Sequence, residues 1–391
     1  MRSIWGAAGT WIVAVLTAVL VTGCGSAAPG SVTARAAAVT SAATSRAPGQ
    51  PSCDPRLIGP IAVSFVSASD GYLLGITLSG CASSTTSTVV LRKTTDGGLH
   101  WTALPAPPAP WGGIAPDGTG RIPADGVTSV LFADARDGWA YGPGLWATHD
   151  GGATWRQVGT SGGRAVQAMT ASGGQVLASL GAHPVAVETT PASRDAWRPV
   201  PGAGDGGTGA VPVLTARAGT GYAVSPAIGQ FDADVPMLTG PADGSARWAS
   251  RPLPCRPGAI ALTAVTATRL LLACALLGTH PATTYLYSSS DAGARWTRFA
   301  VLGLFDGAST IEQAPDGTML IAGIYDGVEL SRDGGRTWTR PAVVDDSDSI
   351  QGGGQLAASL VTSEDGYVLG YLGPLWITRD AGRTWTQVPV R

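Results

Sequence analysis

Short apolar segments, separated by glycine turns, follow one another along most of this chain. In one clear example, residues 61–66 form a largely apolar run, Asp70-Gly71 interrupts it, and a second apolar run extends to Gly75. The same order returns at residues 131–139 and 359–370. Short runs that flank a tight glycine turn are typical of antiparallel strands. The pattern predicts an all-β protein built from many short hairpins.

A second motif recurs in phase with these hairpins. Five segments share the pattern Ser/Thr-x-Asp-x-Gly-x-x-Trp, at residues 94–101, 148–155, 289–296, 331–338 and 378–385. Two degraded copies fill the gaps: in one, Asp243 precedes Trp248 by five positions, and in the other Trp197 remains although the aspartate is lost. The residues that we assign to complete or partial motifs are Asp96, Trp101, Asp150, Trp155, Asp243, Trp248, Asp291, Trp296, Asp333, Trp338, Asp380 and Trp385.

The spacing of the seven motif tryptophans indicates the architecture. From residue 101 to residue 385 their mean separation is about 47 residues, within the range of about 40–50 residues typical of four-stranded propeller blades. Each unit would contain a strand, a glycine turn, a second strand, a loop, a third strand, an aspartate turn and a tryptophan-bearing strand. We therefore expect a seven-bladed β-propeller of four-stranded antiparallel blades.

The motif has a physical explanation that requires no ligand. The aspartate carboxylate and the Ser/Thr hydroxyl can bond backbone N–H groups in the turn, and glycine adopts the positive φ that the turn requires. The tryptophan can pack between neighbouring sheets and remove about 150–250 Å² from water. We therefore predict a structural role for these residues, and we assign no catalytic residue, metal or cofactor.

These motifs resemble the Asp-box (BNR) repeat family, which includes sialidases and also exported propellers related to photosystem II assembly factors. The assembly-factor pattern, Phe-x-Asp…Gly-Trp followed by Thr-x-Asp-Gly-Gly-x-Thr-Trp, is similar to residues 131–155. The resemblance covers residues 59–391 and implies the propeller fold. It implies little about activity, because functional sites are grafted onto shared folds.

The N-terminal region has the features of an export signal. Arg2 precedes an apolar stretch at residues 12–21, which is followed by Thr22-Gly23-Cys24. This ending resembles the bacterial lipobox, in which the cysteine is lipidated; the alternatives are an ordinary secretory signal or a membrane anchor. The expected parts are a lipoprotein signal peptide, a flexible Ala/Ser/Thr/Pro tether and the propeller, at residues 1–24, 25–52 and 53–391.

Cysteine usage is consistent with an extracytoplasmic protein anchored in the cell membrane through Cys24. Four further cysteines can form disulfides in three connectivities: Cys53, Cys81, Cys255 and Cys274. The repeat favours Cys53–Cys81 and Cys255–Cys274, since these pairs occupy related positions in the first and fifth units. Their spacing matches neither a zinc site nor a CxxC redox motif.

The composition narrows the range of partners. Charged residues make up 13% of the chain and its net charge is −2, so it lacks the basic surplus that would neutralise nucleic-acid phosphates. Hydrophobic residues make up 44%, which argues against intrinsic disorder. We expect a monomeric propeller whose partner is a protein or an extracellular glycan, and no nucleic acid.

Candidate binding residues lie in the loops that we expect on the face opposite the aspartate turns. They are Trp111, Arg121, Arg164, Asp345, Asp346 and Asp348. Gly120-Arg121-Ile122-Pro123 is similar to the Arg-Ile-Pro element of sialidases, but it follows the first aspartate turn, whereas the sialidase element precedes it. Sialidases also need a tyrosine activated by glutamate; only Glu312 falls near an inner strand, and no tyrosine has a recognisable nucleophile context.

We therefore predict a non-catalytic extracytoplasmic lipoprotein that acts as a binding or assembly scaffold through loops on a propeller face. The alternative is a sialidase-like glycoside hydrolase, or a propeller that binds carbohydrate without turnover. The acidic residues 345–348 could hold a cation, but they lack the EF-hand spacing. The histidines show neither metal nor triad spacing in the sequence; they are His100, His149, His183 and His280.

Overall fold

The computed structural model divides the chain into two compact units, Met1–Pro51 and Ser52–Arg391. The structure describes residues 58–77, 88–113, 122–160, 162–181, 186–204, 213–224, 236–255, 259–275, 283–303, 308–323, 327–341, 357–370 and 373–390. The predicted signal peptide and tether lie outside these residues, as does Cys24. The described residues include no helix with the length and apolar character needed to cross a membrane.

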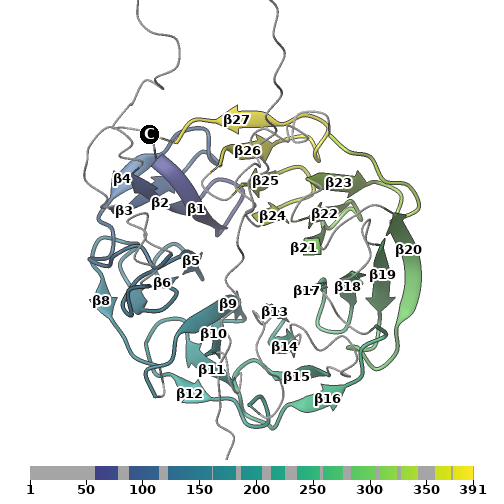
Figure 1. The fold of residues 1–391 in the computed structure, drawn as a ribbon, viewed down its shortest axis with the longest axis horizontal. Coiled ribbons are helices and arrows are strands. Elements are labelled where there is room, and N and C mark those ends of the chain that lie inside the picture. The colour runs from purple at the N-terminus through teal and green to yellow at the C-terminus, as the bar shows by residue number, and fades with distance from the viewer. Residues whose placement is uncertain are drawn as a thin grey trace, which may run out of the picture. The chain divides into compact units, whose positions relative to one another are not determined.

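The second unit contains seven sheets of consecutive antiparallel strands. The first three blades contain β1 (Ile58–Phe65), β2 (Gly71–Thr77), β3 (Val89–Thr94), β4 (Thr102–Leu104); β5 (Ser129–Phe132), β6 (Gly138–Tyr141), β7 (Leu145–Thr148), β8 (Arg156–Gln157); β9 (Val166–Ser172), β10 (Gln175–Leu180), β11 (Ala186–Pro191) and β12 (Arg198–Pro199). Blades 4 and 5 contain β13 (Val213–Arg217), β14 (Thr220–Val224), β15 (Met237–Pro241), β16 (Ala249–Arg251); β17 (Ala259–Ala264), β18 (Leu270–Ala275), β19 (Thr283–Ser289) and β20 (Thr297–Gly303). Blades 6 and 7 contain β21 (Ala308–Gln313), β22 (Met319–Gly323), β23 (Val328–Ser331); β24 (Ala357–Leu360), β25 (Gly366–Leu369), β26 (Leu375–Thr378) and β27 (Thr386–Val388). These sheets form a ring (Figure 1), and the predicted seven-bladed β-propeller is confirmed.

The sixth blade has a single backbone bridge where the other blades have a fourth strand. Leu330 and Thr339 exchange two backbone hydrogen bonds, of 2.9 and 2.8 Å. Two residues later the chain reaches Pro341, which has no N–H group with which to continue the pairing. The outermost strand of this blade is therefore reduced to one pair of residues.

Asp-Gly pairs join the first and second strands of four blades, and two of them show why glycine is needed. Phe65 pairs with Gly71 in blade 1, and Phe132 pairs with Gly138 in blade 2. A Cβ atom at Gly71 would lie 2.7 Å from the Phe65 ring, and one at Gly138 would lie 2.5 Å from the Phe132 ring. Glycine is required because the aromatic ring at the end of the first strand lies against the backbone of the second.

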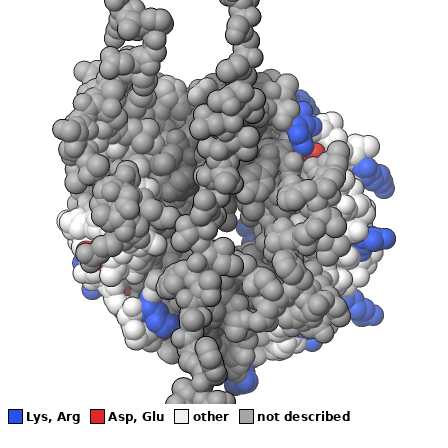
Figure 2. All heavy atoms as spheres, in the orientation of Figure 1, with Lys and Arg blue, Asp and Glu red and all other residues white. Residues whose placement is uncertain are grey.

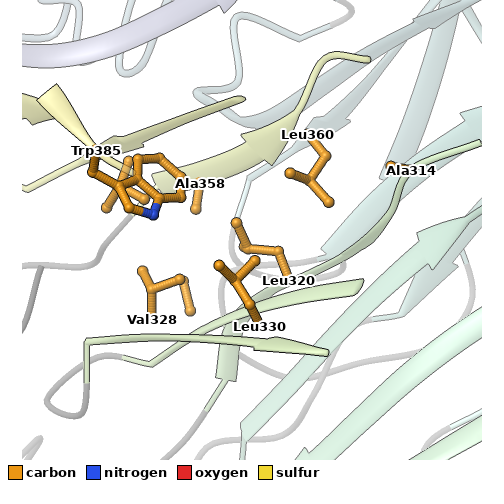
Figure 3. Packing of buried hydrophobic residues seen from close by; sticks show 9 residues of the cluster. Ala314, Leu320, Val328, Leu330, Ala358, Leu360 and Trp385 are labelled. Atoms are coloured by element: carbon orange, nitrogen blue, oxygen red, sulfur yellow. The ribbon is translucent and has the colours of Figure 1, made fainter. Parts of the chain in front are cut away.

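The hydrophobic core is distributed over the seams between neighbouring blades. Each of seven clusters combines residues of two adjacent blades and includes one motif tryptophan. Trp248 and Trp385 are 3% and 6% exposed, and the other five indoles are half-buried. Figure 3 shows Trp385 of blade 7 in the cluster with Val328 and Leu330 of blade 6. The motif tryptophans therefore fill the spaces between the sheets.

The ring closes through contacts between blades 7 and 1, whose yellow and purple strands lie side by side in Figure 1. Ile58 and Leu73 of blade 1 share a cluster with Leu375 of blade 7. The Arg379 guanidinium of blade 7 donates to the backbone oxygen of Asp96 in blade 1 at 2.6 Å. All four strands of blade 7 come from the C-terminal part of the chain. Closure therefore depends on packing and hydrogen bonding and needs no N-terminal strand in that sheet.

Replacing Trp385 with alanine should lower the free energy of unfolding by about 3–5 kcal/mol, because it leaves a cavity in a packed seam. Urea unfolding of the full chain, followed by circular dichroism, measures this change. Leu99→Ala is the matched control: Leu99 is 51% exposed, and its truncation should change stability by no more than about 0.5 kcal/mol. Equal effects of the two substitutions would contradict the assignment of the seams as the core.

Candidate functional site

The chain path places two kinds of connection at opposite ends of each blade. In an antiparallel blade, the turn between the first and second strands and the aspartate turn between the third and fourth strands lie at the same end. We call the surface formed by these turns the turn face. The connections at the other end include most of the residues that the structure leaves undescribed. The described side chains therefore belong chiefly to the strands and the turn face.

Two of the predicted binding residues lie within the described part of the chain. The Trp111 indole is half-buried against the seam between blades 1 and 2, and its backbone forms a bridge with Val127. The Arg164 guanidinium donates to the backbone oxygen of Leu180 at 2.8 Å. The Arg164 side chain thus has a polar partner within the propeller, whereas the Trp111 indole has apolar packing and its N–H is buried without a hydrogen-bond partner among the described residues. The remaining candidates lie outside the described residues: Arg121, Asp345, Asp346 and Asp348.

Cys255 and Cys274 form a disulfide, with their Cα atoms 6.5 Å apart. Cys274 is buried in β18, whereas Cys255 precedes β17. The bond therefore joins the start of blade 5 to its second strand. This is one of the two pairs that the repeat favours; the other two cysteines, Cys53 and Cys81, lie outside the described residues.

The aspartate turns are closed by hydrogen bonds within each turn. In blade 2 the Thr148 hydroxyl donates to Asp150 at 2.8 Å and accepts the Gly152 N–H at 2.9 Å. The N–H and the hydroxyl of Thr154 donate to the two oxygens of the same carboxylate at 2.9 and 2.6 Å. The bond from the motif hydroxyl recurs at four other aspartates, Asp96, Asp291, Asp333 and Asp380. The carboxylates serve as acceptors within their turns, and the described residues contain no group of three His, Cys, Asp or Glu side chains that could hold a metal ion.

A cavity of about 470 Å³ opens on the turn face among the innermost strands of blades 4 to 7. Its charged and polar side chains come from the ends of these strands and from the turns that follow them: Arg217, Thr266, Arg269, Glu312, Gln313 and Asp316. Leu360 and Val361 of blade 7 add an apolar wall. The cavity therefore combines residues that are far apart in the sequence.

Three charged groups of this cavity are available to a ligand. Within the described part of the chain, the side chains of Arg217, Arg269 and Glu312 make no hydrogen bond and no ion pair. Burial raises the pKa of the half-buried Glu312 to about 7, although the charge of Arg217 opposes the rise. Near neutral pH the Glu312 carboxyl group can thus donate or accept a hydrogen bond, whereas the two guanidinium groups only donate.

The tyrosine on which the Glu312 charge acts is Tyr367, in β25. Its ring stacks on Phe65 in the seam between blades 7 and 1, with the ring centres 5.4 Å apart. Burial, Glu312 and Tyr141 all raise the pKa of Tyr367, whereas a nucleophilic tyrosine needs activation by a base or a lowered pKa. Glu312 and Tyr367 therefore give no support to the sialidase alternative.

Arg269 connects this cavity to a second hollow on the turn face. The second hollow, of about 520 Å³, lies over the aspartate turn of blade 5 and is bordered by Arg269, Ser288, Ser290 and Arg295. Elsewhere, Lys and Arg side chains stand at the rim of the molecule in the view of Figure 2, with few Asp or Glu beside them. Of the two arginines that border the hollow, Arg295 is paired with Asp291 of the same aspartate turn at 3.1 Å.

Only part of this site could be predicted from the sequence. Glu312 stood out because it is the one glutamate near an inner strand, but the sequence provided no sign of Arg217 or Arg269. Both arginines lie where the Asp-Gly turn of the repeat is lost. Each arginine lies at the junction of the first and second strands of its blade, and this position in the repeat is the sequence feature that could have indicated them.

Comparisons with known proteins agree with the fold. The chain is similar to YCF48 bound to D1 peptide, at 18% identity and a TM-score of 0.54, over 83% of this chain and 94% of that one. It is also similar to YCF48 from Cyanidioschyzon merolae, at 16% identity and a TM-score of 0.55, over 85% of this chain and 98% of that one. No protein-family model and no curated protein matches the chain. The resemblance to assembly-factor propellers is therefore confirmed for the fold.

The aspartate turns make stability depend on pH in acid. Hydrogen bonds from Thr154 lower the pKa of Asp150 to about 2, and those from Thr337 do the same for Asp333. In the folded protein these pKa values lie below the ordinary value of 3.8, so the ionised carboxylates stabilise the folded state. Their contribution is present above about pH 4 and is lost as the pH falls from about 4 to 2. Asp150→Asn should therefore show a smaller acid-induced fall in Tm than the unaltered chain.

Thermal unfolding between pH 5 and pH 2, followed by circular dichroism, measures this difference. Glu364→Gln, which removes an exposed carboxylate outside the aspartate turns, is the control and should retain the full acid-induced fall. A fall of the same size in Asp150→Asn and in the control would show that the turn carboxylate does not contribute.

Proposed function

We propose that this chain, which has the fold of the YCF48 propellers, is a non-catalytic scaffold that binds a segment of a partner protein in the cavity of its turn face. The observation that carries the proposal is the grouping of Arg217, Arg269 and Glu312 in one cavity, with no hydrogen bond or ion pair to their side chains within the described residues. Charged groups held in this way can bond to an incoming polar segment without first breaking an internal hydrogen bond.

The chemistry of the cavity suits a peptide that bears carboxylates. Guanidinium groups donate charge-assisted hydrogen bonds to carboxylates, and these bonds are stronger than those between neutral groups. The Glu312 carboxyl group can pair with a backbone N–H or C=O, and Leu360 with Val361 can contact an aliphatic side chain. A protein segment offers all of these groups together. Arginine is also among the residues enriched in protein interfaces.

The structural comparison supports a partner of this class. One of the two YCF48 structures has D1 peptide bound, which makes it an example of a similar propeller in complex with a peptide. We extend this kind of interaction, without its particular partner, to the present chain. Nothing in the proposal requires a photosynthetic partner.

We also propose an extracytoplasmic, membrane-anchored location, as the N-terminal sequence predicts. Export and lipidation at Cys24 would place the propeller outside the cytoplasm, and the Ala/Ser/Thr/Pro segment at residues 25–52 would act as a flexible tether. A tethered propeller could turn its cavity toward partners in or near the same membrane. Two further experiments test the binding site and the anchor separately.

The double substitution Arg217→Ala/Arg269→Ala should weaken the binding of acidic peptides by about tenfold or more, because it removes both charge-assisted donors. Fluorescence anisotropy with labelled acidic, neutral and basic peptides measures the Kd of each for the full chain. Arg336→Ala removes an exposed guanidinium from the aspartate turn of blade 6 and should leave the Kd within about twofold. Equal binding to both variants, or no binding by the unaltered chain, would refute the proposed site.

Cys24→Ala should abolish both lipid labelling and membrane retention. The full chain would be produced in a bacterium that processes lipoproteins, labelled with radioactive palmitate and separated into membrane and soluble fractions. The unaltered chain and the control Ser26→Ala should carry the label in the membrane fraction. An unlabelled Ser26→Ala and an unlabelled unaltered chain would rule out the lipoprotein assignment, without affecting the peptide-binding measurement.

A further inference from the structure

The turn between β11 and β12 of blade 3 departs from the repeat, and its aspartate, Asp195, makes contacts outside the turn. Ala192 stands where the other turns have the motif aspartate, and Asp195 lies three positions later. The turn closes without a carboxylate: the Thr190 hydroxyl donates to the backbone oxygen of Arg194 at 2.6 Å and accepts the Ala196 N–H at 2.9 Å. Asp195 is therefore not needed to close its own turn.

Asp195 instead crosses the seam and contacts blade 2. Its side chain is only 4% exposed. Oδ1 accepts a hydrogen bond from the Trp139 indole N–H at 2.9 Å. Oδ2 lies 3.0 Å from Nε2 of His149 and 2.5 Å from the Arg156 guanidinium. The carboxylate that the repeat would use within one blade here joins two blades.

His149 of blade 2 lies between two carboxylates. Its Nδ1 is 2.7 Å from Oδ1 of Asp137, and its Nε2 is 3.0 Å from Oδ2 of Asp195. Ionised carboxylates only accept hydrogen bonds, so both contacts are hydrogen bonds only when both ring nitrogens carry a proton. A neutral imidazole has one N–H and would turn a lone pair toward the other carboxylate. The geometry therefore selects the imidazolium form.

The groups that face His149 come from every element packed around it. Asp137 belongs to the turn between β5 and β6, Asp195 to the turn between β11 and β12, and Arg156 to β8. The Trp139 ring of β6 meets the imidazole edge-on, with the ring centres 6.0 Å apart. Burial lowers the pKa of His149, but the hydrogen bonds to the two carboxylates outweigh it and the net shift is upward.

We propose that Asp137, His149 and Asp195 form a proton-dependent latch between blades 2 and 3, which is closed when His149 is protonated. When the imidazole loses a proton, it can keep only one donor. Asp195 retains the donors of Trp139 and Arg156, whereas His149 is the one side chain of the described residues that donates to the Asp137 carboxylate. The remaining N–H should therefore stay with Asp137, and the hydrogen bond of His149 to Asp195 is released. Asp195 is then joined to blade 2 by Trp139 and Arg156 alone, so the seam is weakened.

The direction of the pH effect follows from the raised pKa of His149. The stabilisation by the latch is complete below the ordinary histidine value of about 6.5 and is lost as the pH rises through the higher folded value. The seam between blades 2 and 3 should thus open more readily in mildly alkaline solution. Asp137 lies in the same blade as His149, so only the part of the rise that comes from Asp195 is lost when the seam opens. Each pKa unit of that part corresponds to an approximately tenfold change in the opening equilibrium.

Hydrogen–deuterium exchange of the full chain at pH 6 and pH 8.5, corrected for the intrinsic dependence of exchange on pH, tests the latch. Peptides that cover residues 145–158 and 186–199 should exchange several-fold faster at the higher pH. His149→Gln should lose this dependence, since an amide has the same donors at both values. Equal corrected exchange at both values in the unaltered chain, or an unchanged dependence in His149→Gln, would overturn the proposal.

His100→Gln is the matched control. His100 also lies in an aspartate turn, but it contacts one carboxylate, that of Asp96 in its own turn, and its side chain is 87% exposed. This variant should keep the pH dependence at the seam between blades 2 and 3. Loss of that dependence in the control would show that the effect is not specific to the latch.

An NMR titration of the His149 imidazole gives a readout that does not require His149→Gln to fold. The midpoint should lie above 6.5 in the unaltered chain and should fall in Asp195→Asn, where a neutral amide replaces one carboxylate. A midpoint at or below 6.5 in the unaltered chain, or one that Asp195→Asn leaves unchanged, would also overturn the proposal.

Discussion

A four-stranded blade of this length is too small to have a core of its own, so it is stable only when neighbouring blades cover its faces. The motif tryptophans meet this requirement by lying between the sheets: Trp385, for example, packs with residues of blades 6 and 7. The last seam must form in the same way as the others, by contact of blade 7 with blade 1. The cavity and the latch both depend on this ring, because each draws its residues from more than one blade.

Apolar packing holds the seams together but is not directional, and polar contacts on the turn face add direction. Tyr72 of blade 1 donates to the Ala135 oxygen of blade 2 at 2.9 Å, and Arg332 of blade 6 donates to the Ala381 oxygen of blade 7 at 2.9 Å. In both contacts the acceptor is a backbone oxygen of the next blade. The seam between blades 2 and 3 differs because a histidine takes part, so one structural contact there is also a titratable one.

The aspartate turns explain why a strong sequence motif says little about function. Their carboxylates, hydroxyls and N–H groups are largely satisfied within the turn, as at Asp150, and they leave little for a ligand. Several of the charged side chains that act outside their own turn occur in copies that depart from the repeat. Arg217 and Arg269 lie in hairpins without the Asp-Gly turn, and Asp195 lies in the copy that lost its motif aspartate.

The seven units, their antiparallel strands and the positions of the turns could all be predicted from the sequence, because strand period and turn chemistry are properties of neighbouring residues. Even the one weak strand, after β23, has a local cause in Pro341. Which distant side chains meet depends on how the blades pack in three dimensions. His149 has no partner in its local sequence, because its two carboxylate partners are 12 and 46 positions away. The cavity likewise joins Arg217, Arg269 and Glu312 from three blades, and no local pattern records that closure of a ring brings them together.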